Sequence, residues 1–279
     1  MQGKIVAATG ATSGIGEKAV EALARQGARI VLIARDRARA EVTLARLERV
    51  APGLGHSAHF ADLSLMREAK RVGAEIAASE PRIDVLINNA GAIFANRRVT
   101  IEGFERTFAL NHMSYFIVTA QLIGALKAAA QGRIVSTASR AHRGVRLDFD
   151  DLQSARSYSG WGAYQRSKLA NILFTRDLAR RLAGESVSAN CLHPGLVDTR
   201  FADEAGGWTT RAFSLVKRFA ISSERGADTI VYLATSPDAA AVSGEYFAKR
   251  KIAASSDAAR EMDAARQLWE ISEELMTSV

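Results

Sequence analysis

The run Tyr164-Gln165-Arg166-Ser167-Lys168 places a phenol four residues before an ammonium group. On a helix this spacing puts both side chains on one face, a turn apart. A unit charge ~4 Å from the phenol is worth on the order of 4 kcal/mol at an effective dielectric of ~20, and it favours the phenolate. Lys168 is therefore expected to lower the pKa of Tyr164 towards the range of general acid–base catalysis. By itself the pair could also be a chance pairing on a solvated helix.

Helix-like and strand-like patterns alternate along the whole chain. Apolar residues at helical spacing after Lys168 predict a helix, and shorter apolar runs predict strands. This alternation is typical of right-handed β-α-β units. We predict an α/β fold with a single doubly wound (Rossmann-type) parallel sheet of about seven strands, helices on both faces, and residues 1–279 in one domain. The predicted strands span residues 5–9, 29–34, 56–60, 83–88, 133–138, 187–192 and 245–248, and the later helices span about 64–79, 101–129, 161–183, 223–235 and 256–276.

A glycine-rich turn follows the first predicted strand and opens a helix. Gly14-Ile15-Gly16-Glu17-Lys18-Ala19 fits the pattern G-x-G-x-x-G/A, and Gly10 tightens the same turn. Glycines let backbone amides approach a pyrophosphate, whose charge is favoured at the helix N-terminus. Because the pattern follows a predicted strand and opens a helix, it predicts a dinucleotide site. The alternative is that it is merely a tight strand–helix turn.

The end of the second predicted strand bears on the choice of nucleotide. Ala34 stands where the acid of an NAD enzyme is expected, and Arg35 follows it. An arginine there can pair with a 2′-phosphate, so NADP is predicted and NAD is less favoured. Asp36 is the competing signal, and we interpret it as the N-cap of the next helix.

Composition excludes several classes of protein. Cys191 is the only cysteine, so no intramolecular disulfide can form, which suits a reducing compartment. The longest apolar stretch, residues 116–130, is interrupted by polar residues and is too short to span a bilayer. The net charge of +7 could suggest nucleic acid, but the basic residues are dispersed. We therefore predict a cytoplasmic protein without a membrane span, a nucleic-acid partner or a metal site.

Taken together, the motifs of the chain resemble the short-chain dehydrogenase/reductase family over nearly the whole length. Stretches such as Ser139-Arg140-Ala141-His142 and the run from Ser167 to Phe174 are similar to the retinol dehydrogenase and WW-domain oxidoreductase branch. The motifs that carry the resemblance are Thr9 to Gly16, Asp62-Leu63, Asn88-Asn89-Ala90-Gly91, Asn111, Ser139, Tyr164 with Lys168, and Pro194-Gly195 with Thr199.

The resemblance implies a role for each matching residue. Ser139 would hydrogen-bond the substrate oxygen, Tyr164 would exchange its proton, Lys168 would hold the nicotinamide ribose, and Asn111 would order a water in a proton relay. Asp62 would contact the adenine. The implied catalytic set is Asn111, Ser139, Tyr164 and Lys168, and the implied cofactor-binding set is Gly10, Thr12, Ser13, Gly14, Ile15, Gly16, Arg35, Asp62, Leu63, Asn89, Ala90, Gly91, Tyr164, Lys168, Pro194, Gly195, Val197 and Thr199.

These residues favour an NADP-dependent oxidoreductase that interconverts an apolar alcohol with its aldehyde or ketone. Two alternatives are an NADPH-dependent carbon–carbon double-bond reductase and a non-catalytic NADP-binding sensor or scaffold. Residues 196–221, rich in aromatic side chains, are interpreted as a lid over the substrate, and residues 143–159 as a loop beside the substrate mouth. The family likeness suggests a homodimer or homotetramer through the long helices, unless the C-terminal helix covers that surface.

Overall fold

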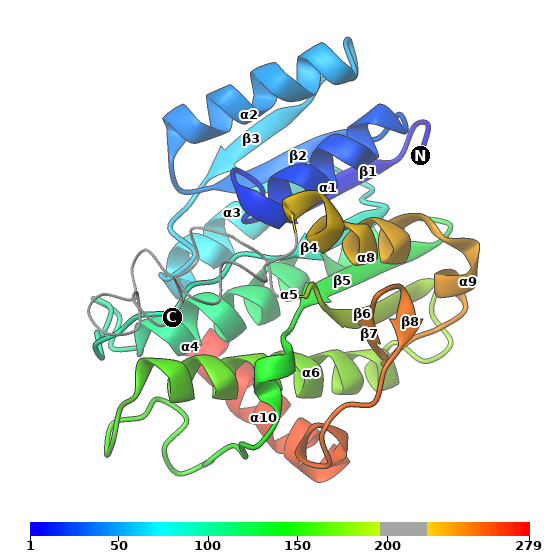
Figure 1. Cartoon of the computed structure of the whole chain (residues 1–279). Helices are drawn as coiled ribbons and strands as arrows, with labels where there is room; N and C mark the ends of the chain where they lie inside the picture. The colour runs from blue at the N-terminus through cyan, green and yellow to red at the C-terminus, as the bar shows by residue number, and fades with distance from the viewer. Residues whose placement is uncertain (196–221) are drawn as a thin grey trace.

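A central sheet organises the computed structural model, which describes residues 1–195 and 222–279 (Figure 1). The strand order is β3-β2-β1-β4-β5-β6-β7-β8, parallel from β3 to β7, with β8 antiparallel to β7. The order reverses direction at β1, where open α/β sheets bind ligands at the carboxyl ends of their strands. The strands are β1 Ile5–Thr9, β2 Arg29–Ala34, β3 Ser57–Phe60, β4 Val85–Asn88, β5 Gly132–Thr137, β6 Val187–His193, β7 Tyr246–Ala248 and β8 Lys251–Ile252.

Helices cover both faces of this sheet, as the alternating pattern predicts. Successive strand residues point to opposite faces, so Val6 and Ala8 pack with α1 and α8 whereas Ala7 packs with α3 and α5. Two apolar layers result, one on each side of the sheet. The helices are α1 Gly14–Arg25, α2 Arg37–Val50, α3 Met66–Ser79, α4 Arg106–Phe108, α5 Ser114–Lys127, α6 Gly160–Arg181, α8 Ser223–Thr235, α9 Pro237–Ala240 and α10 Met262–Thr277, with a π-helical turn at Ala109–Met113 and 3-10 turns at Arg140–His142 and Ala258–Arg260.

The prediction of one helix over residues 101–129 was wrong at its N-terminal end. Residues 98–106 form a hairpin, in which Thr100 N donates to Phe104 O and Arg106 N donates to Arg98 O. The helix begins after Glu105, whose carboxylate accepts from Thr107 N and Phe108 N as an N-cap. The eighth strand, β8, was not predicted from the sequence. It is two residues long and follows a turn where Lys249 and Arg250 adopt positive φ.

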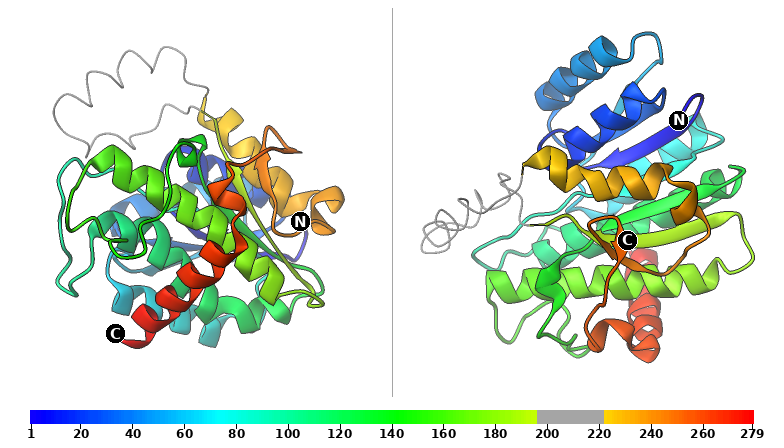
Figure 2. Two further views of the ribbon diagram at one scale, coloured as in Figure 1. Left: turned by 90° about the horizontal axis from the view of Figure 1, so that it is seen from below. Right: turned by 45° about the vertical axis from the view of Figure 1, so that its right-hand side comes forward.

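The C-terminal helix α10 crosses beneath α6 (Figure 2). The Trp269 ring stacks on Phe174 of α6 with a centroid distance of 5.9 Å, and the Arg181 guanidinium lies 4.3 Å above the indole. Trp269 also makes an edge contact with Phe116 of α5. The helix thus covers apolar surface that α5 and α6 would otherwise present.

Two further predictions concern a membrane span and a lid over the substrate. Among the helices of residues 1–195 and 222–279, none has both the length and the hydropathy needed to cross a bilayer. The lid predicted for residues 196–221 lies outside the described residues, so it stays a prediction.

Candidate active site

The carboxyl ends of β1, β4 and β5 bring the predicted site residues together. The glycine turn follows β1, Asn89-Ala90-Gly91 follows β4, and Ser139 lies two residues after β5. Helix α6 then brings Tyr164 and Lys168 to the same end of the sheet. Parallel strands place these termini at one edge, which is why segments far apart in sequence meet there.

The glycine turn packs directly on the segment after β4. Gly10 has φ +63°, and a Cβ on it would lie 2.7 Å from Ala90 Cα, so no other residue fits there without displacing backbone. Gly14 also adopts positive φ, at +58°. Within the described residues, Ser13 at the start of α1 makes no side-chain cap hydrogen bond, which suits a helix N-terminus that receives a pyrophosphate. The turn therefore fits the expected dinucleotide.

Asn89 joins the ends of three strands. Its side chain donates from Nδ2 to Gly10 O at 2.9 Å and accepts at Oδ1 from Thr137 Oγ1 at 3.1 Å. Thr9 Oγ1 accepts from the backbone amides of Asn89 and Ala90. Both polar atoms of the Asn89 side chain thus make hydrogen bonds that hold the ends of β1, β4 and β5 together, and its predicted contact with the cofactor stays a prediction.

Asn111 lies in the π-helical turn between α4 and α5 and is fully buried. Its Oδ1 accepts from Ala92 N at 2.9 Å, and its Nδ2 donates to Ala92 O at 2.9 Å and to Ser167 Oγ at 3.0 Å. A Cβ on Gly91 would lie 3.1 Å from Asn111 Oδ1 and 3.5 Å from Lys168 Nζ. Asn111 thus anchors the loop that follows β4, next to Lys168. Its role in a water relay stays a prediction. Such π-turns are frequent at functional sites.

Ser139 and Tyr164 form the pair that a carbonyl oxygen could reach. Ser139 caps the 3-10 turn at Arg140–His142, where its Oγ accepts from Ala141 N at 3.1 Å. Burial raises the pKa of Tyr164 to about 12, and a side-chain hydrogen bond with Ser139 acts in the opposite direction. Two hydroxyls therefore converge, and at neutral pH the phenol holds its proton.

Lys168 behaves differently from the expectation. Its Nζ donates to Thr137 O at 2.9 Å and lies 5.7 Å from the centroid of the Tyr164 ring. Burial lowers the pKa of Lys168 to about 7, because the charged form loses its hydration. The lysine is therefore not a permanent cation, and the predicted lowering of the Tyr164 pKa by its charge is not seen.

The side chains predicted to lie near the adenosine follow the ends of β2 and β3. Arg35 is exposed directly after β2, and Asp36 caps α2 by accepting from Arg39 N at 3.0 Å. Asp36 is therefore a helix cap, as predicted. Asp62 Oδ1 accepts from Ser64 N and Ser64 Oγ, and Leu63 is buried next to it.

Beyond β6 the description covers only part of the predicted set. Pro194 and Gly195 follow the strand, and Gly195 adopts φ +97°. Val197 and Thr199 lie outside the described residues. Their predicted contacts with the nicotinamide stay predictions.

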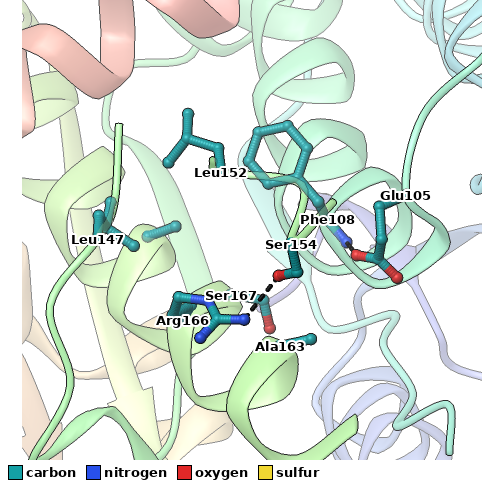
Figure 3. Close-up of a pocket in the computed structure, with 9 residues that line it drawn as sticks. Glu105, Phe108, Leu147, Leu152, Ser154, Ala163, Arg166 and Ser167 are labelled. Carbon is teal, nitrogen blue, oxygen red and sulfur yellow. Dashed lines mark hydrogen bonds between the residues drawn. The ribbon is translucent and has the colours of Figure 1, made fainter. Parts of the chain in front are cut away.

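The loop of residues 143–159 packs against α6 (Figure 3). Arg166 Nη2 donates to Ser154 Oγ at 2.6 Å, and Tyr158 OH donates to Phe94 O at 2.9 Å. A small cavity lies between this loop, α4 and α6, and Tyr164 and Lys168 are not among its lining residues. Residues 147, 152 and 154 of the loop thus pack against α6 around this cavity, and the place of the loop beside the substrate mouth stays a prediction. The cavity is lined by Glu105, Phe108, Leu147, Leu152, Ser154, Ala163, Arg166, Ser167 and Ala170.

Sequence reasoning undervalued several side chains around the site. His142 is fully buried and bonds Ser139 O through Nδ1 at 2.6 Å. Gln165 donates to Ala141 O at 3.1 Å, and Asn171 reaches the same Thr137 carbonyl as Lys168. The signal that could have found His142 was its place in the motif that begins with Ser139.

Comparisons with known proteins agree with this geometry. The family model described as short chain dehydrogenase matches residues 4–209. Retinol dehydrogenase 14 of Mus musculus is 41% identical over 286 residues, covering 98% of this chain and 86% of the relative. A crystal structure of an uncharacterized protein from Mycobacterium paratuberculosis superposes with a TM-score of 0.79 at 29% identity, covering 99% of this chain and 94% of that one. The Pseudomonas aeruginosa RhlG/NADP active-site complex superposes at 0.70 and 27% identity, covering 88% and 94%.

Proposed function

The chain belongs to the short-chain dehydrogenase/reductase family, in its retinol dehydrogenase branch, and on this premise we propose that it interconverts an apolar alcohol with its aldehyde or ketone, using NADP. The family membership makes it an NAD(P)-dependent oxidoreductase of alcohols and carbonyls. The observation that carries the proposal is the convergence of Ser139 and Tyr164, with Lys168 one helical turn further on. The apolar substrate is supported by the retinol dehydrogenase relative, since retinol is an apolar alcohol.

The chemistry of these residues suits proton transfer to a carbonyl oxygen. When bound, a nicotinamide supplies or accepts the hydride. Negative charge then develops on the substrate oxygen, and two hydroxyl donors stabilise it. Because the pKa of Tyr164 is about 12, its phenol is the protonated donor that reduction needs at neutral pH. Ser139 donates the second hydrogen bond.

The preference for NADP rests on the basic end of β2. Arg35 is exposed there, and Arg37 lies with its guanidinium 4.0 Å from the centroid of the Phe60 ring. An exposed guanidinium at this place can pair with a 2′-phosphate. The RhlG/NADP complex supports the proposal as a structural neighbour that holds NADP.

Tyr164→Phe tests the proposal. With NADPH and a panel of apolar aldehydes and ketones, the variant should lose at least about 100-fold in kcat/KM, because general acid catalysis contributes about 10²–10⁴-fold. Cofactor-dependent melting should confirm that the variant still binds NADPH. Full turnover by Tyr164→Phe would contradict the assignment.

The two alternative functions give different results in the same assay. Reduction of a carbon–carbon double bond would leave the Ser139→Ala variant active, and product analysis would show a saturated carbonyl. A sensor or scaffold would bind NADPH and consume none of it with any substrate in the panel.

A further inference from the structure

The 3-10 turn at Arg140–His142 carries Ser139 at its N-cap, so the direction of the Ser139 hydroxyl depends on how this turn is held. Three side chains from three separate elements hold it. Gln165 of α6 donates to Ala141 O at 3.1 Å, and His193 at the end of β6 accepts from Arg140 N through Nδ1 at 3.3 Å. The third is His142, the last residue of the turn itself.

His142 bonds backbone groups through both ring nitrogens. Nδ1 lies 2.6 Å from Ser139 O, and Nε2 accepts from Ser256 N at 3.1 Å. A backbone amide can only donate, so Nε2 must be unprotonated and the proton must lie on Nδ1, which donates to Ser139 O. The ring is fully buried and makes an edge contact with Tyr246, with centroids 5.1 Å apart. Its orientation and tautomer are therefore determined by three different parts of the chain.

We propose that His142 is a positioning residue for the reaction at Tyr164: as the neutral Nδ1–H tautomer it holds the Ser139 carbonyl and thereby aims the Ser139 hydroxyl at the Tyr164 hydroxyl. The inference rests on the proposed function. The same ring also accepts a hydrogen bond from Ser256 N, six residues before α10. The segment that leads into the C-terminal helix therefore helps to hold the turn that carries Ser139. Rotation of the Ser139 peptide would move both its carbonyl and its hydroxyl, and misplacement of a reacting group by ~1 Å can cost about 10²-fold in rate.

Three substitutions separate the two bonds of the ring. The amide of Asn in His142→Asn reaches the position of Nδ1 and can still donate to Ser139 O. The longer amide of His142→Gln reaches the position of Nε2 and can satisfy Ser256 N but not Ser139 O. His142→Ala loses both bonds. We expect kcat within about 5-fold of wild type for His142→Asn and about 10–100-fold lower for His142→Gln and His142→Ala, with the Kd for NADPH unchanged in all three.

His56 supplies the matched control. It also bonds two backbone groups, accepting from Ile30 N at 3.0 Å and reaching Ala51 O at 3.2 Å, but at the start of β2 and β3, far along the sheet from Ser139. His56→Gln should lower Tm without changing kcat. The proposal is overturned if His142→Gln loses no more kcat than His56→Gln, or if His142→Asn is no better than His142→Ala.

A crystal structure of His142→Ala gives a readout that needs no substrate. It should show Ser139 Oγ displaced from the Tyr164 hydroxyl while Lys168 Nζ remains on Thr137 O. An undisplaced Ser139 would overturn the positioning role. Absence of turnover in the wild-type protein would instead count against the proposed function, and the two failures are therefore distinguishable.

Discussion

At the scale of single residues, the site is governed by how much water its groups lose. Lys168 is 2% exposed, and burial brings its pKa to about 7. The same burial raises the pKa of Tyr164, so one environment moves an acid and a base in opposite directions. Both effects favour neutral groups, and both depend on the packing around α6.

Lys168 should make the stability of the apoprotein depend on pH. Between pH 7 and the unfolded pKa near 10.5, the unfolded chain binds a proton that the folded chain does not, so folding becomes more favourable as pH rises. The free energy of unfolding of wild type relative to Lys168→Met should therefore increase between pH 7 and 9, by up to about 1.4 kcal/mol per pH unit. Urea titrations at several pH values measure it, and a difference independent of pH would contradict the lowered pKa.

Arg35 should contribute to affinity for NADPH and not to affinity for NADH. Loss of a hydrogen bond between charged groups costs about 1.5–3 kcal/mol, so Arg35→Ala should raise the Kd for NADPH about tenfold or more. Arg49→Ala, at the far end of α2, is the control and should leave both affinities unchanged. Equal weakening of NADH and NADPH by Arg35→Ala would argue against recognition of the 2′-phosphate. Calorimetric titration gives both constants.

At the scale of elements, the π-helical turn at Ala109–Met113 explains how a mid-helix asparagine reaches another loop. The wider turn carries Asn111, which bonds both backbone groups of Ala92 and the Ser167 hydroxyl of α6. One side chain thus links the segment after β4 to the helix that bears Tyr164 and Lys168. The periodicity of the sequence showed a continuous helix here, because one extra residue in a turn scarcely alters an apolar pattern.

Asn111→Ala should loosen this link. Removing the amide leaves backbone groups of Ala92 without their partner, which costs about 1–3 kcal/mol. We expect a lower urea midpoint and weaker NADPH binding, since Gly91 lies against Lys168. Asn96→Ala, which changes an asparagine on the loop that follows, is the control. An unchanged urea midpoint for Asn111→Ala would show that this link does not contribute to stability.

At the scale of the whole molecule, α10 decides which surface remains open. Leu268 is buried, and Trp269 packs on Phe174 of α6 and Phe116 of α5. A dimer or tetramer through α5 and α6, suggested by the family likeness, would have to displace this helix. We expect the full chain not to associate through that face.

Weakening α10 tests its covering role. Leu268→Ala should destabilise the protein by about 2–5 kcal/mol, the usual cost of truncating a buried leucine. Removal of residues 262–279 should expose the α5–α6 surface and cause self-association in sedimentation experiments. Leu275→Ala, in the partly buried last turns, is the milder control. A truncated chain that stays monomeric and fully stable would contradict this account of α10.

Local signals in the sequence were sufficient for the fold class, the order of the elements and the placing of Tyr164 beside Lys168. Alternating apolar runs mark the strands, the glycine turn requires positive φ at Gly10, and four-residue spacing places Tyr164 and Lys168 on one face of α6. These features depend on neighbours within a few residues, and a linear pattern records them. The tertiary structure alone decided the protonation of the site, the engagement of Asn89, the support of Ser139 by His142, and the position of α10 across α6. The protonation depends on burial, Asn89 bonds residues 79 and 48 positions away, and His142 is held by Ser256, 114 positions away. Only the packed chain brings these groups together.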